Sequence, residues 1–470
     1  MLGRRHINNL PGEVLDYIFS FLDFESLRMA AQACLHWRDH GIDHPTFWRN
    51  VKATSATAGA LDMLAARLGQ SCGRPFSLTI DIEAPLRPAA EKRLMNLITA
   101  IMPTVQQLHI RLNSFCLVTL WSVLNLHPPE LTSFSLKLYN PDRVMARDPL
   151  NAWIFNNLPG KLREVTIEDV TIPSEHLYFP AFSNLHTLQM FHPSGSHSPF
   201  PVFIFENCRH LHTLLLQCGI FTYEDPWTAA ALEGLSQLTV LDVHLDPLAR
   251  NEFVAQMPLL NDIPVVILTM PPDEDAVYDF LAGVGSPFNV GLITLDANDF
   301  FVLIEDDRTG YMRKMVVSKK AYARAPDSNG QIHPLFENDE FPAQVQFLKV
   351  SLSIWNLLVP YMTLYTSLPK LMVDLSVPNG ALVEGLDGTP LAFCALDTFV
   401  LENNEPGCAF VMVDDIISFV DSVLQAPQCR RLEVHRVFPR GDLAALHRRF
   451  DHVTYSPVIH GRPIIRRRTR

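Results

Sequence analysis

Two cysteines and two histidines lie close together in the middle of the chain and carry the side chains that zinc prefers: Cys208, His210, His212 and Cys218. The residues Leu211, Leu214 and Leu216 among them have the spacing of a strand whose apolar side points inward. Cys218 would then lie at the far end of that strand, where it could not complete a tetrahedron with the others. We expect ordinary structural positions here and no metal.

No short motif for nucleotide binding or hydrolysis occurs in the sequence: GxxxxGK[ST], GxGxxG, GxSxG and HExxH are all absent. The acidic runs at 273–275 and 306–307 are explained by a helix start and by a turn. We therefore expect a chain without enzymatic activity and without a cofactor. The alternative, an enzyme with a cryptic site, has no motif in its favour.

Arginine is concentrated at the C-terminal end. The whole chain has 38 Lys plus Arg against 50 Asp plus Glu, and this net charge of -12 argues against a dedicated nucleic-acid binder. Residues 428–470 instead hold 11 arginines and three acids, a local net charge of +8. Because arginine pairs bidentately with carboxylates and phosphates, we expect Arg430, Arg431 and Arg436 to contact an acidic or phosphorylated partner. The alternative is a solvated basic tail at 462–470, such as a nuclear-import signal.

The composition indicates the kind of protein that must position these residues. With 470 residues, 48% of them hydrophobic and 19% charged, the chain is folded and too long for one compact core. Its eight cysteines are scattered singly, which does not suggest a disulfide framework. No signal-peptide core follows Arg4 and Arg5, and no apolar stretch is long enough for a membrane span. We expect a cytoplasmic or nuclear protein that has neither nucleic acid nor a membrane as partner.

The first fifty residues predict three short helices. An apolar stripe runs from Leu10 to Leu22 at three- and four-residue spacing, and Pro11 suits the first helical turn. Asp23 can cap a second helix, and Trp37 lies on a third. Helices this short share too little interior to cover so much apolar surface. A partner or the rest of the chain must therefore cover it.

The order of these residues resembles an F-box. The resemblance covers about forty residues and rests on Leu10-Pro11-x-Glu13-Val14-Leu15-x-x-Ile18-x-x-x-Leu22, then Leu27, Ala33-Cys34, Trp37 and Phe47-Trp48. The sequence departs from the family pattern at Phe24, where proline is common, and at Ala33, where a larger aliphatic residue is common.

This resemblance implies that the module docks on the Skp-type adaptor of a Skp–cullin–F-box (SCF) ubiquitin ligase, and through it on a cullin–RING ligase. The adaptor contacts that it implies are Leu10, Pro11, Val14, Leu15, Ile18, Leu22, Leu27 and Cys34. Trp37 and Trp48 are expected to brace the module internally. The alternative is a small helical bundle that packs on the body of the chain.

One sequence pattern, which we call the apolar phrase, recurs through the body: an apolar residue, any two residues, a second apolar residue, any one residue, and a third apolar residue. Copies begin at Val105, Leu131, Leu162, Leu185, Leu211 and Leu238, and weaker ones at Phe76, Ile263, Val290, Val345, Leu368, Leu396 and Cys429. Steps of mostly 23 to 31 residues, with helical patterns between the copies, are typical of leucine-rich repeats. We expect the fold class α/β: a short all-α F-box module followed by a leucine-rich-repeat solenoid of about 12 degenerate repeats.

A double-length step between the copies at 290 and 345 contains a predicted β-hairpin with Gly310 in its loop. Insertions in repeat arrays tend to emerge on one face, often the binding face. The predicted domains are an F-box at 1–52, a linker helix at 53–74, the solenoid at 75–437 with a hairpin insertion at about 298–335, and a basic C-terminal cap or tail at 438–470. The junction at 54–78 also resembles fungal F-box proteins.

In each phrase the apolar residues face the core, so their neighbours are expected on the concave surface, where a target protein would bind. The predicted substrate-binding residues are Gln189, Phe191, Gln217, Asp242, His244, Lys349, Lys370, Arg430, Arg431, His435 and Arg436. Phe191 is the expected anchor, because aromatic residues dominate interface energetics. The sequence favours a substrate-recognition adaptor of an SCF ubiquitin ligase, a non-catalytic subunit. The alternative is an F-box scaffold that binds the Skp-type adaptor without directing ubiquitylation.

Overall fold

The computed structural model describes residues 10–113, 116–139, 150–151, 153–170, 179–192, 197–223, 226–246, 249–269, 274–319, 340–375, 382, 390–404 and 409–456. The chain divides into two compact units, residues 1–239 and residues 240–470. A short helical region comes first, and each unit contains a mostly parallel sheet with helices. The expected fold class, α/β after an N-terminal helical module, is therefore confirmed at this level.

The helical module consists of α1 (Gly12–Phe19), α2 (Phe24–Ala30), α3 (Leu35–Asp43) and α4 (Pro45–Trp48). Side-chain caps start α2 and α3. Asp23 Oδ1 accepts a hydrogen bond from Ser26 N at 2.8 Å, so the predicted cap of α2 is confirmed. Cys34 Sγ accepts from Trp37 N at 3.5 Å and starts α3 in the same way.

The interior of the module is small. Leu15, Phe19 and Leu27 are fully buried and form its core. Trp37 packs edge-on against Phe19 with 5.9 Å between the ring centroids, and Trp48 is buried. Both tryptophans therefore brace the module internally, as expected.

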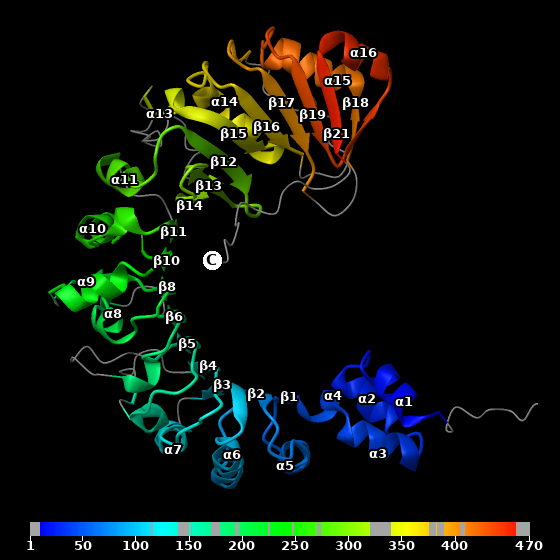
Figure 1. The fold of residues 1–470 in the computed structure, drawn as a ribbon, viewed down its shortest axis with the longest axis vertical. Helices are drawn as coiled ribbons and strands as arrows, with labels where there is room; N and C mark the ends of the chain where they lie inside the picture. The colour runs from blue at the N-terminus through cyan, green and yellow to red at the C-terminus, as the bar shows by residue number, and fades with distance from the viewer. Residues whose placement is uncertain are drawn as a thin grey trace, which may run out of the picture. The chain divides into compact units, whose positions relative to one another are not determined.

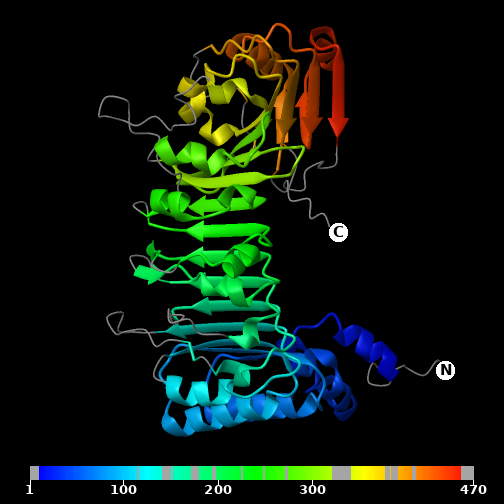
Figure 2. The same ribbon diagram turned by 60° about the vertical axis from the view of Figure 1, so that its left-hand side comes forward.

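The strands of the first unit lie in chain order and are all parallel: β1 (Asn50–Ala53), β2 (Phe76–Ile82), β3 (Val105–Asn113), β4 (Ser133–Tyr139), β5 (Glu164–Glu168), β6 (Thr187–Phe191) and β8 (Thr213–Gln217). Its helices are α5 (Ala58–Gln70), α6 (Pro88–Ile101), α7 (Leu117–Leu124), α8 (Phe203–Asn207) and α9 (Ala229–Leu235), with 3-10 turns η3 (Ile154–Asn157) and η4 (Pro180–Phe182). Figures 1 and 2 show these helices on one side of the strands. In each unit we call the side of the sheet that its helices leave uncovered the open face.

Alternation along each strand explains which side chains form the core. Leu108 and Ile110 of β3 are fully buried under the helices, whereas His109 between them is directed to the open face and half-buried. Every apolar phrase predicted in the body coincides with a strand in the structure. The positions of the strands in the body could therefore be predicted from the spacing of their apolar residues.

The strands of the second unit have the order β10 (Val240–His244), β11 (Val265–Thr269), β14 (Met312–Ser318), β13 (Asp299–Glu305), β12 (Phe288–Thr294), β15 (Val345–Ser351), β16 (Lys370–Asp374), β17 (Thr398–Glu402), β19 (Arg431–His435) and β21 (His452–Ser456). Its helices are α10 (Arg250–Gln256), α11 (Glu274–Leu281), α13 (Glu340–Ala343), α14 (Trp355–Met362), α15 (Val413–Ser418) and α16 (Leu443–Arg449). Shorter turns are η5 (Leu260–Asp262), η7 (Leu352–Ile354) and η8 (Phe419–Val423).

Each unit also has a two-stranded parallel ribbon. In the first unit β7 (His197–Pro199) pairs with β9 (Ile220–Thr222), and in the second β18 (Ala409–Met412) pairs with β20 (Val437–Arg440). The apolar phrases did not predict either ribbon.

The hairpin of β13 and β14 lies within the sheet and is not an outgrowth from one face. β14 pairs in parallel with β11, and β13 pairs antiparallel with both β14 and β12. Phe300, Val302 and Met315 of the hairpin are fully buried, so the hairpin continues the apolar core across the sheet. The described part of the predicted insertion, residues 298–319, is therefore integrated into the sheet, and residues 320–335 lie outside the described part.

The sheets also extend beyond the predicted limits of 75 and 437. β1 lies within the predicted F-box and pairs with β2, whereas β21 lies within the predicted tail and pairs with β19. The helix expected as a linker, α5, packs against β1 and α6 as part of the helical layer. The last fourteen residues, 457–470, are outside the described part of the chain.

Candidate functional site

Large apolar side chains are exposed on the helical module. Tyr17 on α1 and Phe21 in the turn after it are 67% and 71% exposed, and their rings meet edge-on with 5.0 Å between centroids. Met29 on α2 and Leu35 on α3 are 62% and 70% exposed, and Val14 is exposed as well. So much exposed apolar surface on a module of this size is typical of a protein-interaction surface. We call these five residues the exposed apolar set.

The predicted adaptor contacts fall into three environments. Pro11 and Val14 are exposed, and the half-buried positions are Leu10, Ile18, Leu22 and Cys34. Leu15 and Leu27 have no exposed surface, because they form the core of the module with Phe19. A side chain without exposed surface cannot touch a partner unless the core opens. Leu15 and Leu27 therefore have a structural role in the core, and their contact with a partner stays a prediction.

Sequence reasoning missed four of the most exposed apolar residues. Tyr17 lies two positions after Leu15 and therefore on the opposite side of α1, and Phe21 lies in the turn that follows the helix. The four-residue spacing of Tyr17 and Phe21 in the sequence already indicated a second apolar face. Met29 and Leu35 were overlooked because the first lies between core positions and the second directly follows the cap of α3.

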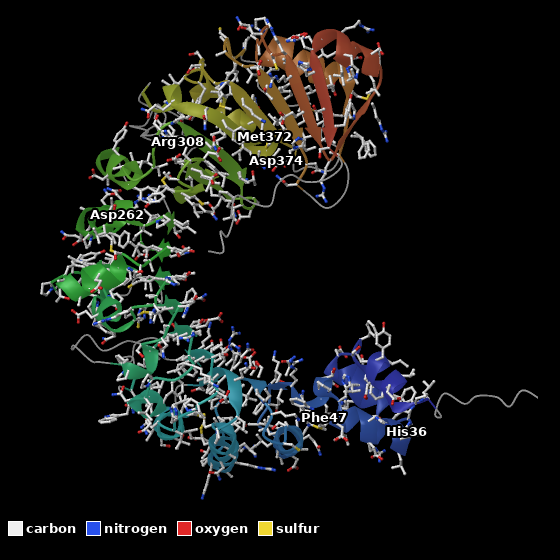
Figure 3. The ribbon with its side chains drawn as sticks, in the orientation of Figure 1. His36, Phe47, Asp262, Arg308, Met372 and Asp374 are labelled. Carbon is white, nitrogen blue, oxygen red and sulfur yellow. The ribbon has the colours of Figure 1, made fainter. Side chains whose placement is uncertain are left out.

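Two histidines of α3 fix the N-terminal part of α1 against α3. His36 Nε2 lies 3.2 Å from the carbonyl oxygen of Leu10, and His40 Nδ1 lies 3.8 Å from Oδ1 of Asp16. A Cβ at Gly12 would come within 2.6 Å of the His40 ring, so glycine allows the close approach of α1 to α3. In Figure 3 His36 lies on the module at a distance from the first strand of the sheet.

A buried arginine joins the module to the body. Arg67 of α5 donates from Nε to the carbonyl of Phe47 at 2.6 Å and from Nη2 to the carbonyl of Asn50 at 2.7 Å. Its guanidinium also lies 3.6 Å from the centroid of the Phe24 ring. Burial lowers the pKa of Arg67 to about 10. The module is therefore fixed to the body by a charged group surrounded by carbonyls and rings; Figure 3 labels Phe47 at this junction.

The open face of the first unit is polar and half-buried. Gln189, Phe191 and Gln217 lie there, with Phe191 in register between Glu168 and Gln217 on the neighbouring strands. Phe191 is half-buried, which is less exposed than we expected of an anchor. Lys137 Nζ pairs with Glu168 at 2.6 Å, so the charges of this face compensate each other.

The open face of the second unit carries a network of paired charges. Lys349 Nζ contacts the buried Glu402, and Lys370 Nζ lies 3.1 Å from Glu433. His435 Nε2 lies 3.8 Å from the same Glu433 carboxylate, and on β10 the ring of His244 lies 3.0 Å from Asp242. Figure 3 labels Met372 and Asp374 of β16 on this face. The predicted residues of these strands therefore lie on one face, although their charges are largely paired within the chain.

The arginines expected to bind an acidic partner have carboxylates of their own. Arg430 pairs with Asp451 at 3.9 Å, and Arg431 pairs with Asp397 at 3.6 Å. Both pairs are exposed, so each contributes little to stability but lowers the local positive charge. Arg436 follows β19, is half-buried and has a positive φ of 56°, an uncommon conformation for a residue with a side chain.

The cysteines and histidines of the zinc-type cluster in the sequence can be located in the structure. Within the described residues, no three His, Cys, Asp or Glu side chains gather where they could hold a metal ion. Cys208 is buried, and burial raises the pKa of its thiol to about 12, which suppresses the reactive thiolate. No helix in the described part of the chain is long and apolar enough to cross a bilayer.

Comparison with known families gives one finding. Residues 7–54 match the model of an F-box-like domain, a range that covers α1 to α4 and β1. The expected F-box is thereby confirmed as a domain of the F-box-like kind. F-box domains generally bind Skp-type adaptors, so this domain suggests a role in adaptor binding for SCF-type ubiquitin ligases. No match to the chain was found among the curated proteins.

Proposed function

We propose that this protein is a target-recognition subunit of an SCF-type ubiquitin ligase. In this proposal the F-box-like domain docks on a Skp-type adaptor, the rest of the chain holds a target protein, and other subunits carry out the ubiquitin chemistry. The chain itself would be non-catalytic, and the complex would act in the cytoplasm or nucleus.

The observation that carries the proposal is the exposed apolar set on the F-box-like domain. Tyr17, Phe21, Met29 and Leu35 are each more than 60% exposed, although the core of the domain consists of only a few residues. Burying such side chains in an interface is favourable by about 1.5–3 kcal/mol for each one that becomes fully covered. A partner that covers them would therefore gain much of its affinity there.

We interpret the body as degenerate leucine-rich repeats. The support is the repeated succession of a short parallel strand, with two to four buried apolar residues, and a helix or turn on one side. Such arrays offer long surfaces to partner proteins, and here the open faces carry the polar and charged residues that we predicted. This interpretation favours protein targets.

The test is capture of a recombinant Skp-type adaptor by the full chain. We expect the wild-type chain to co-purify with the adaptor, and the double variant Phe21→Ser with Leu35→Ser to lose at least about tenfold in affinity. Val118→Ser is the matched control, because Val118 is 85% exposed in the same unit but lies outside the F-box-like domain. Equal capture by the wild type and the double variant would refute the assigned docking surface.

A second measurement separates the recognition subunit from the scaffold. The captured complex is combined with a cullin–RING module, ubiquitin and its activating and conjugating enzymes, and proteins of a native extract are searched for new ubiquitin conjugates. Conjugates that depend on the full chain and vanish with the double variant support target recognition. Adaptor capture without any such conjugate favours the scaffold.

A further inference from the structure

The β18–β20 ribbon of the second unit carries an exposed apolar patch. Phe410, Met412 and Phe438 are 42%, 50% and 48% exposed, and Leu443 just after the ribbon is 46% exposed. Their strand neighbours Ala409, Val411 and Val437 are buried. Alternation therefore anchors one side of the ribbon in the core and directs the large apolar side chains outward. We call Phe410, Met412, Phe438, Arg440 and Leu443 the ribbon patch.

The side chains of Phe410, Phe438 and Arg440 lie against one another. Phe410 and Phe438 are register partners, and their ring centroids lie 6.0 Å apart. Met412 is opposite Arg440, whose guanidinium carbon lies 3.9 Å from the centroid of the Phe410 ring. The patch thus combines aromatic rings, a flexible thioether and an arginine, the residue types enriched at the centres of protein interfaces.

The ribbon of the first unit provides an internal comparison. β7 and β9 have the same two-stranded parallel pairing. There Phe221 is buried, Ile220 is half-buried and the exposed position is His197. An outward aromatic pair is therefore not a requirement of this kind of ribbon, and the ribbon patch calls for an explanation of its own.

Arg440 differs from the arginines around it. Arg430, Arg431, Arg448 and Arg449 each pair with an aspartate of the chain, at 3.9, 3.6, 2.8 and 2.7 Å. In the described residues no carboxylate comes within ion-pair distance of Arg440, and its guanidinium is stacked on a ring instead. The edge of a stacked guanidinium keeps its N–H groups available for a bidentate contact. Arg436 has no ion pair among the described residues either, but it is half-buried, whereas Arg440 is exposed and open to a partner.

We propose that the ribbon patch binds a segment of a partner protein that carries an apolar side chain next to a carboxylate. The apolar side chain would cover Phe410 and Phe438, and the carboxylate would pair with Arg440. This inference rests on the proposed function, because it gives the chemistry by which a target would be recognised.

A second copy of the chain is a less suitable occupant. A two-fold contact places the same patch on both sides of the interface, so it would bring two Arg440 side chains, and no carboxylate of the patch, into one apolar contact. Like charges brought together in such a contact are unfavourable. A partner with a carboxylate satisfies both parts of the patch.

The experiment uses the full chain and a phage-displayed library of random twelve-residue peptides. We expect the enriched peptides to share an apolar residue within two positions of Asp or Glu. Synthetic copies of these peptides, measured by fluorescence anisotropy, are expected to bind Phe438→Ser and Arg440→Glu at least about tenfold more weakly than the wild type. All substituted side chains are exposed, and thermal unfolding of each variant checks that the fold is kept.

Arg448→Glu is the matched control, because it reverses an exposed arginine of the same segment outside the patch. It should bind the peptides within about twofold of the wild type. The proposal is overturned if no peptide is enriched, if the enriched peptides lack acids, or if Arg440→Glu binds as well as Arg448→Glu. Adaptor capture is measured separately, so that its failure would count against the proposed function and leave the peptide result unaffected.

Two further outcomes would replace the proposal by another occupant. If light scattering shows a wild-type dimer that Phe438→Ser converts to a monomer, the patch binds a second copy. If peptides bind only after residues 457–470 are removed, the chain's own C-terminal segment occupies the patch.

Discussion

The guanidinium of Arg67 lies 3.6 Å from the centroid of the Phe24 ring, so the first helix of the body is held directly by a ring of the F-box-like domain. The same arginine satisfies the carbonyls of Phe47 and Asn50, at the end of α4 and the start of β1. A planar guanidinium can stack and donate sideways at once, which a lysine ammonium cannot do. The Arg67 side chain thus connects the F-box-like domain directly to the body.

The first prediction concerns this junction. Arg67→Lys should lower the free energy of unfolding by about 2 kcal/mol, because the buried carbonyls lose donors and the Phe24 ring loses its stacked partner. Urea unfolding measures the change, and hydrogen exchange should show faster exchange in residues 45–53. Arg93→Lys, at an exposed ion pair with Asp62, is the control and should stay within about 0.5 kcal/mol. Equal stability of the two variants would show that Arg67 does not hold the junction.

The second prediction separates folding from docking on α1 and α2. Leu15→Ala and Leu27→Ala should each cost about 2–5 kcal/mol, because both side chains are fully buried in a small core. Phe21→Ser should change stability by less than about 1 kcal/mol yet weaken adaptor capture. Thermal unfolding of the isolated variants, followed by adaptor binding below the transition, distinguishes the two effects. A strongly destabilised Phe21→Ser would mean that Phe21 belongs to the core.

The third prediction concerns Glu305 at the end of β13. Burial, followed by the charges of Asp307 and Asp306, raises the pKa of Glu305 from 4.5 to about 7. The folded chain thus binds this proton more tightly than the unfolded chain. The resulting stabilisation is complete below pH 4.5 and is lost as the pH rises through 7.

Glu305→Gln should remove this loss. The substitution should therefore raise the free energy of unfolding by about 1–2 kcal/mol more at pH 8 than at pH 5. The measurement is the urea midpoint of both chains at the two pH values. Glu233→Gln, at an exposed position of α9, is the reference variant and is measured in the same way. A pH-independent effect of Glu305→Gln would contradict the assignment.

The fourth prediction compares two helical glycines. An added Cβ at Gly234 of α9 would lie 2.0 Å from the carbonyl oxygen of Phe205, whereas at Gly59 of α5 nothing lies within 4 Å. Alanine favours a helix over glycine by up to about 1 kcal/mol. The backbone clash at Gly234 exceeds this gain, so Gly234→Ala should destabilise by about 2 kcal/mol and Gly59→Ala should stabilise by about 0.5 kcal/mol. The thermal midpoints of the two variants should therefore move in opposite directions.

The strands of the body could be predicted because their apolar spacing is also their burial pattern. In β8, for example, Leu214 and Leu216 are fully buried at the positions that the phrase indicated. The hairpin was recognised as well, but its place in the sheet was not. Its pairing with β11 depends on contacts between residues about fifty positions apart, which local periodicity does not record.

The candidate site was harder to predict for a different reason. On α1 apolar residues occupy both the Leu15 side and the Tyr17 side, and an apolar pattern alone does not say which side faces inward. The stripe that the family resemblance assigned to the partner includes Leu15, which the small core needs. The ribbon patch was missed because its strands are short and the phrases that we followed do not cover them.

The hairpin also affects how the second unit is made on the ribosome. β11 ends at residue 269, but its neighbour β14 begins only at residue 312, after β12 and β13 have been synthesised. Synthesis proceeds at about 5–20 residues per second, so the edge of β11 stays unpaired for roughly 2–9 s before β14 can pair with it. An array that otherwise grows by adding one strand to the last must here assemble several strands at once. Truncation of the nascent chain between residues 269 and 312 would leave an exposed strand edge, the kind of edge at which chains aggregate.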